Sequence, residues 1–185
     1  PMTIEESSVV AAAGNAAKFW MSRGGFKTRV LSTEKIGHIH FTFKGQKEAL
    51  RNCFEALKPQ LLKATVPLTK NMEKRGGGIS GLKLIDCTSK ITDYYQLEVT
   101  FETADAMGAN FINSCLEQIA VTFETLSKEA SNLKGFLPEV VMSILSNYVP
   151  NCVVRAEVSC AVDDLTIEDH FTGNEFAEKF IHAVR

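Results

Sequence analysis

Four glycines in the stretch KRGGGISGLKLID raise the question of a phosphate-binding loop. Gly76, Gly78 and Gly81 have the spacing G-x-G-x-x-G, which in dinucleotide-binding folds lets a pyrophosphate lie against a helix N-terminus. That chemistry requires a strand before the first glycine and a helix after the last. Here a charged, helix-like TKNMEKR precedes the glycines and a strand-like segment follows them. The sequence therefore predicts a helix end and a glycine-rich turn, and not a Rossmann site.

A second stretch, ADAMGANFINSCLEQ, has residues that could bind an anion. Asp105 is a favourable N-cap, and the small Ala106 and Gly108 would let an anionic ligand approach the free N–H groups of a helix. A glycine inside a helix costs roughly 1 kcal/mol relative to alanine, which indicates a compensating role. The alternative, which the local pattern alone favours, is that Asp105 only caps and Gly108 permits close packing. In that alternative Asn110 and Asn113 are solvated.

Hydrophobic periodicity predicts the elements that position these residues. A capping box with Thr3 as N-cap and Glu6 as the N3 residue predicts a helix that stops at a Gly-Gly pair, Gly24-Gly25. Alternation in IGHIHFTF predicts a strand. The segment QKEALRNCFEALK has a helical pattern, and Pro59 and Pro67 predict that this helix is kinked or broken.

The next segments complete an alternation of strands and helices. LKLIDCT and YYQLEVTF predict two successive strands, and therefore a hairpin. A long amphipathic helix follows from Asp105 to about Glu129, and EVVMSILSNY predicts a fourth strand. The order from Ile36 to Asn147 is typical of the ferredoxin-like βαββαβ unit. The apolar stripe of the long helix consists of Ile112, Leu116, Ile119, Ala120 and Phe123.

Further elements lie outside this unit at both ends of the chain. CVVRAEVSC alternates as another strand, and the capping box Thr172-Gly173-Asn174-Glu175 opens a last helix. We therefore predict an α+β protein in which one domain, residues 35–150, is inserted into an incomplete second domain. The second domain comprises residues 1–34 and 151–185.

Composition limits the classes of function. The chain has 185 residues, 45% of them hydrophobic, and 20 Lys and Arg against 22 Asp and Glu. A net charge of −2 argues against nucleic acid or an anionic membrane as a partner. No apolar run approaches the roughly 18 residues of a membrane span. PMTIEESS also lacks the pattern of a signal peptide, so we expect a cytoplasmic protein.

Cysteines and histidines predict neither disulfides nor a metal site. The five cysteines form no C-x-x-C pair and lie mostly among apolar neighbours, so we expect reduced thiols in core positions. His38 and His40 share one face of a strand but have no acidic or thiol partner nearby in the sequence, and we predict no metal there.

Several motifs together resemble one family. TIEESSVVAAAGNAAKFWMSRGGF is similar to the E-E-P-S-x-V-A-A-A and G-G-F segment of class II hydroxymethylglutaryl-CoA reductases. DAMGAN, with a further N after two intervening residues, resembles that family's nicotinamide dinucleotide motif, and ILSN and VRAEV fall where the family has equivalents. The motifs keep the family's order over nearly the whole chain. The resemblance implies a large domain that binds the CoA thioester and an inserted ferredoxin-like domain that binds the dinucleotide.

The resemblance also implies roles for particular residues. The E-E-P-S match implies a catalytic acid at Glu6 and a substrate contact at Ser8, although Ser7 stands where the family usually has proline. The D-A-M-G-A-N and ILSN matches imply contacts to the cofactor. These cofactor-binding residues are Asp105, Ala106, Met107, Gly108, Asn110 and Asn147.

Glu6 therefore has two competing interpretations. A carboxylate that accepts the N-cap N–H near the positive end of the helix dipole has a lowered pKa. A proton donor to a developing alkoxide needs a raised pKa. Local sequence favours the cap, and the resemblance favours catalysis, which is the hypothesis we prefer.

The choice of cofactor depends on a few residues before the glycine stretch. NADH-using members of the family carry an acidic residue there, which would bind the ribose hydroxyl and repel an added phosphate. This chain has Thr69-Lys70 at that place, with Lys74 and Arg75 close by. NADP(H) is therefore favoured and NAD(H) is the alternative, unless these basic residues are simply a solvated helix end.

The resemblance implies an oxidoreductase that interconverts HMG-CoA and mevalonate with two equivalents of NAD(P)H. Its partners would be HMG-CoA or mevalonate, coenzyme A and, in the complete enzyme, further subunits of a homodimer or higher oligomer. The family's catalytic lysine, aspartate and histidine lie C-terminal to the segment resembled here, so we expect a central fragment that is inactive alone. The alternative function is a stand-alone ferredoxin-like module that binds a nucleotide or small anion without catalysis.

Overall fold

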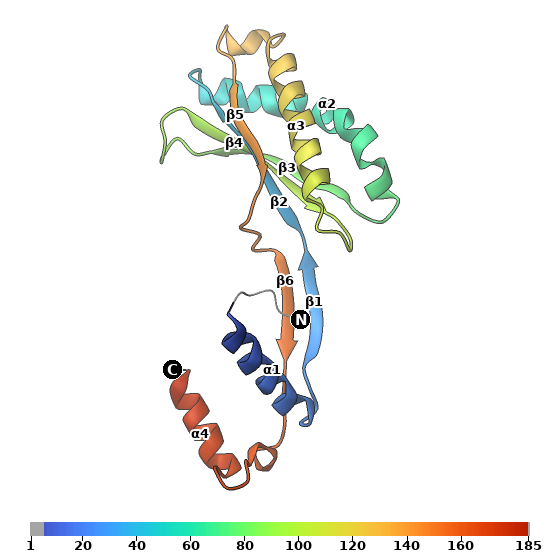
Figure 1. Ribbon diagram of the computed structural model, residues 1–185. Coiled ribbons are helices and arrows are strands. Elements are labelled where there is room, and N and C mark those ends of the chain that lie inside the picture. The colour runs from blue at the N-terminus through green and yellow to red at the C-terminus, as the bar shows by residue number, and fades with distance from the viewer. Residues whose placement is uncertain (1–5, 185) are drawn as a thin grey trace. The chain divides into compact units, whose positions relative to one another are not determined.

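The computed structural model describes residues 6–184, which form two compact units (Figure 1). The larger unit is Ser32–Val153, and the other combines the chain up to Leu31 with the chain from Val154 onward. All of the predicted cofactor-binding residues lie in the larger unit, whereas Glu6 and Ser8 lie in the other. No helix among residues 6–184 is both long enough and apolar enough to cross a bilayer.

A four-stranded sheet forms the centre of the larger unit. Its strands are β2 (Lys35–Thr42), β3 (Gly78–Asp86), β4 (Tyr94–Glu102) and β5 (Glu139–Leu145). They lie in the order β3-β4-β2-β5, and each neighbouring pair is antiparallel. The predicted hairpin is confirmed as β3 and β4. Because β2 and β4 are antiparallel, β2 begins beside the end of β4, where the predicted cofactor loop starts.

Helices α2 (Lys47–Glu73) and α3 (Ala109–Ser127) cover one face of this sheet (Figure 1). The alternate side chains of β2 and β4 that face the helices are buried, as the periodicity predicts. The apolar stripe predicted for α3 is buried along its length. Burial stabilises each large apolar side chain by roughly 1.5–3 kcal/mol, so this core holds the unit together. Its largest members include Phe41, Phe43, Phe54, Phe101, Phe123 and Leu116.

The two prolines of α2 do not interrupt it, so the prediction of a broken helix is wrong. Pro59 and Pro67 lie inside one helix of 27 residues. A proline in a helix interior costs about 3 kcal/mol because it removes a hydrogen bond and crowds the preceding turn. Leu50, Phe54 and Leu61, which are fully or almost fully buried on the same helix, contribute a comparable stabilisation, roughly 1.5–3 kcal/mol each. Packing against the sheet and α3 therefore outweighs the local preference.

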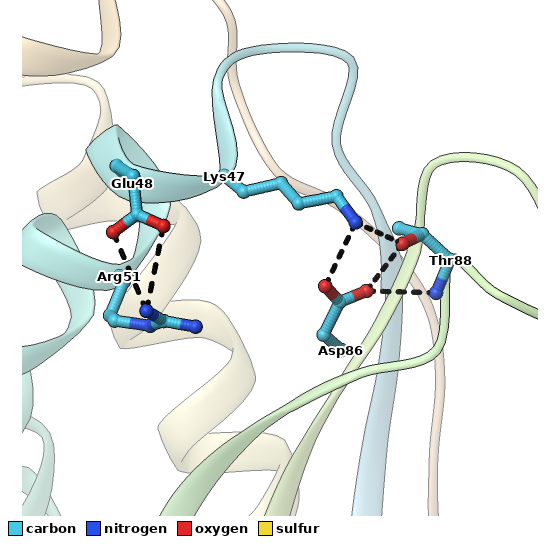
Figure 2. A network of polar contacts seen from close by, with 5 residues as sticks. All are labelled: Lys47, Glu48, Arg51, Asp86 and Thr88. Atoms are coloured by element: carbon cyan, nitrogen blue, oxygen red, sulfur yellow. Dashed lines mark hydrogen bonds and ion pairs between the residues drawn. The ribbon is translucent and has the colours of Figure 1, made fainter.

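A polar network closes the end of the sheet at which β2 finishes (Figure 2). Lys47, at the start of α2, donates to the Asp86 carboxylate at 3.0 Å and to the Thr88 hydroxyl. Asp86 also accepts from the hydroxyl and the backbone N–H of Thr88, at 2.6 and 2.9 Å. These bonds, those from Thr88 first, lower the pKa of Asp86 to about 2. On the exposed side of α2, Arg51 pairs with Glu48 at 3.4 Å.

The other unit contains helices α1 (Ser7–Met21) and α4 (Gly173–Ala183) and a two-stranded sheet. Strands β1 (Lys27–Thr33) and β6 (Cys152–Glu157) form this sheet and connect the two units along the chain. The sequence did not predict β1, because its residues are mostly exposed and show no alternating burial pattern. The strand forms by pairing with β6. Two short 3-10 helices complete the fold: η1 (Ser131–Leu133) in the larger unit and η2 (Asp163–Leu165) in this one.

Aromatic contacts and a helix cap organise this second unit. Phe19 of α1 stacks on Phe176 of α4, with ring centroids 5.6 Å apart. The predicted second capping box is confirmed, since Thr172 and Glu175 each accept the other's backbone N–H. Such a cap satisfies N–H groups that a helix leaves without partners at its N-terminus.

The cysteines follow the core prediction only in part. Cys53 and Cys115 are buried, and burial raises the pKa of the Cys115 thiol to about 11. Cys152 is exposed on β6, so its predicted core position is wrong. All five cysteines are free thiols.

Candidate functional site

The loop between β4 and α3 carries four of the predicted cofactor-binding residues. α3 begins at Ala109 with Gly108 as its N-cap, so the prediction that Asp105 caps this helix is wrong. Gly108 has a φ of +80°, a conformation that costs other L-residues roughly 1–2 kcal/mol. A Cβ atom at Gly108 would also lie 2.5 Å from Cγ2 of Thr103. The glycine is therefore required by the turn into α3, and not by the helix interior as the sequence indicated.

The N-terminus of α3 has neither a side-chain cap nor an acidic side chain in its first turn. The first N–H groups of a helix lack intrahelical partners and form the positive end of its dipole. Asn110, in this first turn, is exposed, and Met107 before it is largely exposed as well. The arrangement differs from α4, whose N-terminus is closed by its capping box.

Asp105 forms an ion pair that the sequence did not reveal. Its carboxylate accepts a hydrogen bond from the Arg75 guanidinium, although its own side chain is 84% exposed. Arg75 comes directly after Lys74, the C-cap of α2, so this basic segment reaches the loop between β4 and α3. Arg75 is thus paired with Asp105, although its own side chain is 52% exposed.

The glycine-rich turn brings that helix end to the loop. As predicted, the glycines follow a helix C-terminus, with φ values of +82° at Gly76 and +126° at Gly78. A Cβ at Gly77 would lie 2.5 Å from the carbonyl oxygen of Glu102, the last residue of β4. Glycine at this position therefore lets the turn pack directly against the strand that leads into the loop.

Two residues outside the predicted motifs, Lys35 and Thr103, form hydrogen bonds that hold the loop. Lys35, the first residue of β2, donates from Nζ to the Ala106 carbonyl at 3.0 Å and to the Thr103 hydroxyl. Thr103, which is fully buried, donates its hydroxyl to the same Ala106 carbonyl at 2.7 Å. Lysine and threonine at these positions carry no sequence signal, because only the register of β2 and β4 brings them together.

A carboxylate fixes the backbone of Ala104, the second residue of the loop. Glu102 accepts from the Thr33 hydroxyl and, at 2.8 Å, from the backbone N–H of Ala104. The bond from Thr33 is the largest cause that lowers the pKa of Glu102. Ala104 has a φ of +52°, which is unusual for a residue with a Cβ, and the Glu102 bond fixes it there.

Asn147 does not join this loop through any hydrogen bond among residues 6–184. It is exposed in the segment after β5. Asn113 of α3 instead accepts the N–H of Leu145, the last residue of β5, at 3.0 Å. The alternative in which Asn113 is solvated is therefore wrong, while Asn110 is exposed as that alternative has it.

The predicted catalytic acid is the N-cap of α1. Glu6 accepts from the Ser8 hydroxyl at 2.6 Å and from the Ser8 N–H at 3.3 Å. These bonds, the side-chain one first, lower the pKa of Glu6. Glu6 is thus not the N3 residue that the sequence predicts, and the proposed N-cap Thr3 lies outside the described residues. In this structure Glu6 caps α1 as the N-cap itself, with Ser8 as its partner, and its predicted catalytic role stays a prediction.

The histidine pair on β2 has an acidic neighbour after all. His38 Nε2 lies 3.6 Å from Glu98 of β4, and His40 is hydrogen-bonded to Tyr94 at 3.0 Å. Burial is the main cause that lowers the pKa of His40. Across residues 6–184 no group of three or more His, Cys, Asp or Glu side chains is arranged to hold a metal ion.

The structure is thus a mixed α/β fold in which the N-terminus of α3 has no side-chain cap. The chain belongs to the hydroxymethylglutaryl-coenzyme A reductase family, whose sequence profile matches residues 1–185. This confirms the family resemblance found in the motifs.

Named relatives agree with this assignment. The 3-hydroxy-3-methylglutaryl-coenzyme A reductase of Archaeoglobus fulgidus is 28% identical over 185 residues, which are 99% of this chain and 40% of that protein. A probable 3-hydroxy-3-methylglutaryl-coenzyme A reductase of Borreliella burgdorferi is 33% identical over 156 residues, which are 84% of this chain and 33% of that protein. The chain thus spans less than half the length of these relatives.

Solved structures show the same fold. The class II reductase of Streptococcus pneumoniae, bound to NADPH in open conformations, matches with a TM-score of 0.73 and 28% identity. The match covers 97% of this chain and 46% of that one. A second structure of the enzyme from this organism matches at 30% identity, also with a TM-score of 0.73, and covers 97% of this chain and 40% of that one.

Proposed function

We propose that this chain contains the dinucleotide-binding domain and part of the substrate domain of a hydroxymethylglutaryl-CoA reductase. The complete enzyme would interconvert HMG-CoA and mevalonate with two equivalents of NAD(P)H, and its partners would be HMG-CoA, mevalonate and coenzyme A. Family membership over residues 1–185 supports the reaction class. One observation supports the cofactor site above all others. The N-terminus of α3 has no side-chain cap, and Gly108, which precedes the helix, places no side chain there.

The topology of the larger unit supports a domain assignment. Residues 35–150 would be a ferredoxin-like domain that binds the dinucleotide, and residues 1–34 and 151–185 would be parts of the CoA-substrate domain. The strand order β3-β4-β2-β5, with both helices on one face, supports the ferredoxin-like assignment. A cytoplasmic enzyme that assembles as a homodimer or higher oligomer remains our expectation for the complete protein.

The residues around α3 fit a dinucleotide. The pyrophosphate would bind the N–H groups of the first turn of α3, because negative charge is favoured at a helix N-terminus. Gly108 leaves the approach free of a side chain, and no acidic side chain in the first turn opposes the charge. When bound, the cofactor supplies the hydride, and the protein positions it. Asp105, Ala106, Met107, Asn110 and Asn147 would be the further contacts.

Arg75 would make NADP(H) the preferred cofactor. The guanidinium is held at the loop by Asp105 and is half-exposed, so it can also meet a phosphate on the ribose. A carboxylate in its place would repel that phosphate. The NADPH bound in the related Streptococcus pneumoniae enzyme agrees with this preference.

Glu6 would act as a proton donor only after its hydrogen bonds change. Its bonds to Ser8 stabilise the carboxylate and lower the pKa of Glu6, whereas a general acid needs the opposite shift. We propose that the bound substrate takes the Ser8 hydroxyl as its own partner. The Glu6 carboxyl then loses its strongest hydrogen bond, and its pKa rises toward the range that proton donation requires.

A fluorescence titration of the chain with NADPH and, separately, NADH tests the proposal. Wild type is expected to bind NADPH more tightly. Arg75→Met should reduce the preference for NADPH by about tenfold, as expected for a lost hydrogen bond between charged groups. Arg51→Met is the matched control, because Arg51 is also an exposed arginine in an ion pair, here with Glu48 on α2 itself. If a folded chain binds neither cofactor, the proposed site is wrong.

A further inference from the structure

Lys35 occupies an unusual place beneath the proposed cofactor loop. It is partly buried and comes from β2, which lies next to β4 in the sheet. Both acceptors of its ammonium belong to the segment that leads into α3: the Thr103 hydroxyl and the Ala106 carbonyl. A partly buried ammonium needs such partners, since an unpaired charge away from water is costly. The ammonium therefore holds the loop against the start of β2.

The orientation of one peptide unit links this contact to ligand binding. The Ala106 carbonyl points toward Lys35 and Thr103, which donate to it at 3.0 and 2.7 Å. All peptides of the described chain are trans, and in a trans peptide the C=O and the following N–H point in opposite directions. The N–H of Met107 is therefore directed away from Lys35. No acceptor for it exists among residues 6–184.

We propose that Lys35 is a positioning residue for the dinucleotide. By holding the Ala106 carbonyl inward, it presents the Met107 N–H, next to the free N–H groups of α3, to the cofactor's pyrophosphate. Its positive charge adds to that of the helix dipole. The inference rests on the proposed function, and it assigns a role to a residue that no cofactor motif contains.

Thr103 acts through the same carbonyl. Its hydroxyl receives the Lys35 hydrogen bond and passes its own to Ala106, so the three groups form one network. Its methyl group packs under Gly108, where a Cβ would clash with it. Loss of either Lys35 or Thr103 should therefore release the same peptide unit, and the two losses should not add.

The test measures the Kd of NADPH by fluorescence titration in Lys35→Met, Thr103→Val and the double variant. Lys35→Met is expected to raise Kd about tenfold, the effect of one hydrogen bond to a charged group. Thr103→Val should raise Kd in the same direction. The double variant should bind no more weakly than the worse single variant. Because Thr103→Val keeps the shape of the buried side chain, the test does not depend on Lys35→Met alone.

Lys47→Met is the matched control. Lys47 also donates to two acceptors, the Asp86 carboxylate and the Thr88 hydroxyl (Figure 2). These lie at the opposite end of the same sheet. The Kd of NADPH in Lys47→Met should stay within about twofold of the wild-type value, as for a surface substitution. Wild-type affinity in Lys35→Met, or equal losses in Lys35→Met and Lys47→Met, would overturn the role of Lys35 and leave the proposed function intact. Failure of the wild type to bind would instead remove the proposed function and this inference with it.

Discussion

Gly108 gives the sharpest quantitative prediction for the loop. In Gly108→Ala, alanine must adopt a φ near +80°, which costs roughly 1–2 kcal/mol. The new Cβ would also lie 2.5 Å from Cγ2 of Thr103, which is fully buried and cannot retreat. Overpacking of this kind typically costs about 1–3 kcal/mol. The free energy of unfolding should therefore fall by about 2–5 kcal/mol in urea denaturation, with an unchanged m value.

Gly76→Ala is the matched control, because it isolates the cost of a positive φ from the cost of the clash. Gly76 has almost the same φ, +82°, but a Cβ there would meet no atom within 4 Å. Gly76→Ala should therefore lose only about 1–2 kcal/mol. Thr103→Ser, which removes Cγ2 and keeps the hydroxyl, should recover part of the loss in Gly108→Ala. Equal losses in Gly108→Ala and Gly76→Ala would refute the reasoning, since the clash with Thr103 would then contribute nothing.

Two further predictions concern the core and the polar network at the far end of the sheet. Leu116→Ala removes a fully buried side chain of α3 and should lower the free energy of unfolding by about 2–5 kcal/mol in a urea titration. Val121 is exposed on the same helix. Val121→Ala should therefore change the free energy of unfolding by less than about 0.5 kcal/mol in the same assay. The pKa of Asp86 in the folded chain, about 2, lies below the unfolded value of about 3.9. The contribution of the Asp86 carboxylate to the free energy of unfolding is thus complete above pH 4 and disappears as pH falls toward 2. Because this carboxylate is 40% exposed, the contribution should amount to less than about 1 kcal/mol. Thermal unfolding of Asp86→Asn should accordingly depend less on pH between 5 and 2 than that of wild type, and equal slopes would contradict the assignment.

Periodicity predicted the parts of the fold that rest on burial. The alternation through Tyr95, Leu97, Val99 and Phe101 places every one of these residues in the core, because the two helices cover that face of β4. The prolines of α2 show where such reasoning fails. Local chemistry predicts a break, but tertiary packing of the helix face supplies more stabilisation than the prolines remove.

The site was predictable where a motif fixes residue types and not where contacts cross the sheet. The segment from Asp105 to Asn110 does form one loop and helix start, but its true cap is Gly108 because only glycine fits above Thr103. Lys35 and Arg75 reach the loop from β2 and from the end of α2. Such contacts depend on strand register and on the glycine turn, which no local pattern specifies.

The central claim is that the first turn of α3 binds the pyrophosphate of the dinucleotide. The most direct measurement is a titration of the ¹⁵N-labelled chain with NADPH, followed by the backbone amide resonances. We expect saturable shifts at Met107, Ala109 and Asn110, with the amide of Thr88, at the other end of the sheet, unchanged. Saturable binding that shifts resonances elsewhere and leaves the first turn of α3 unaffected would contradict the claim.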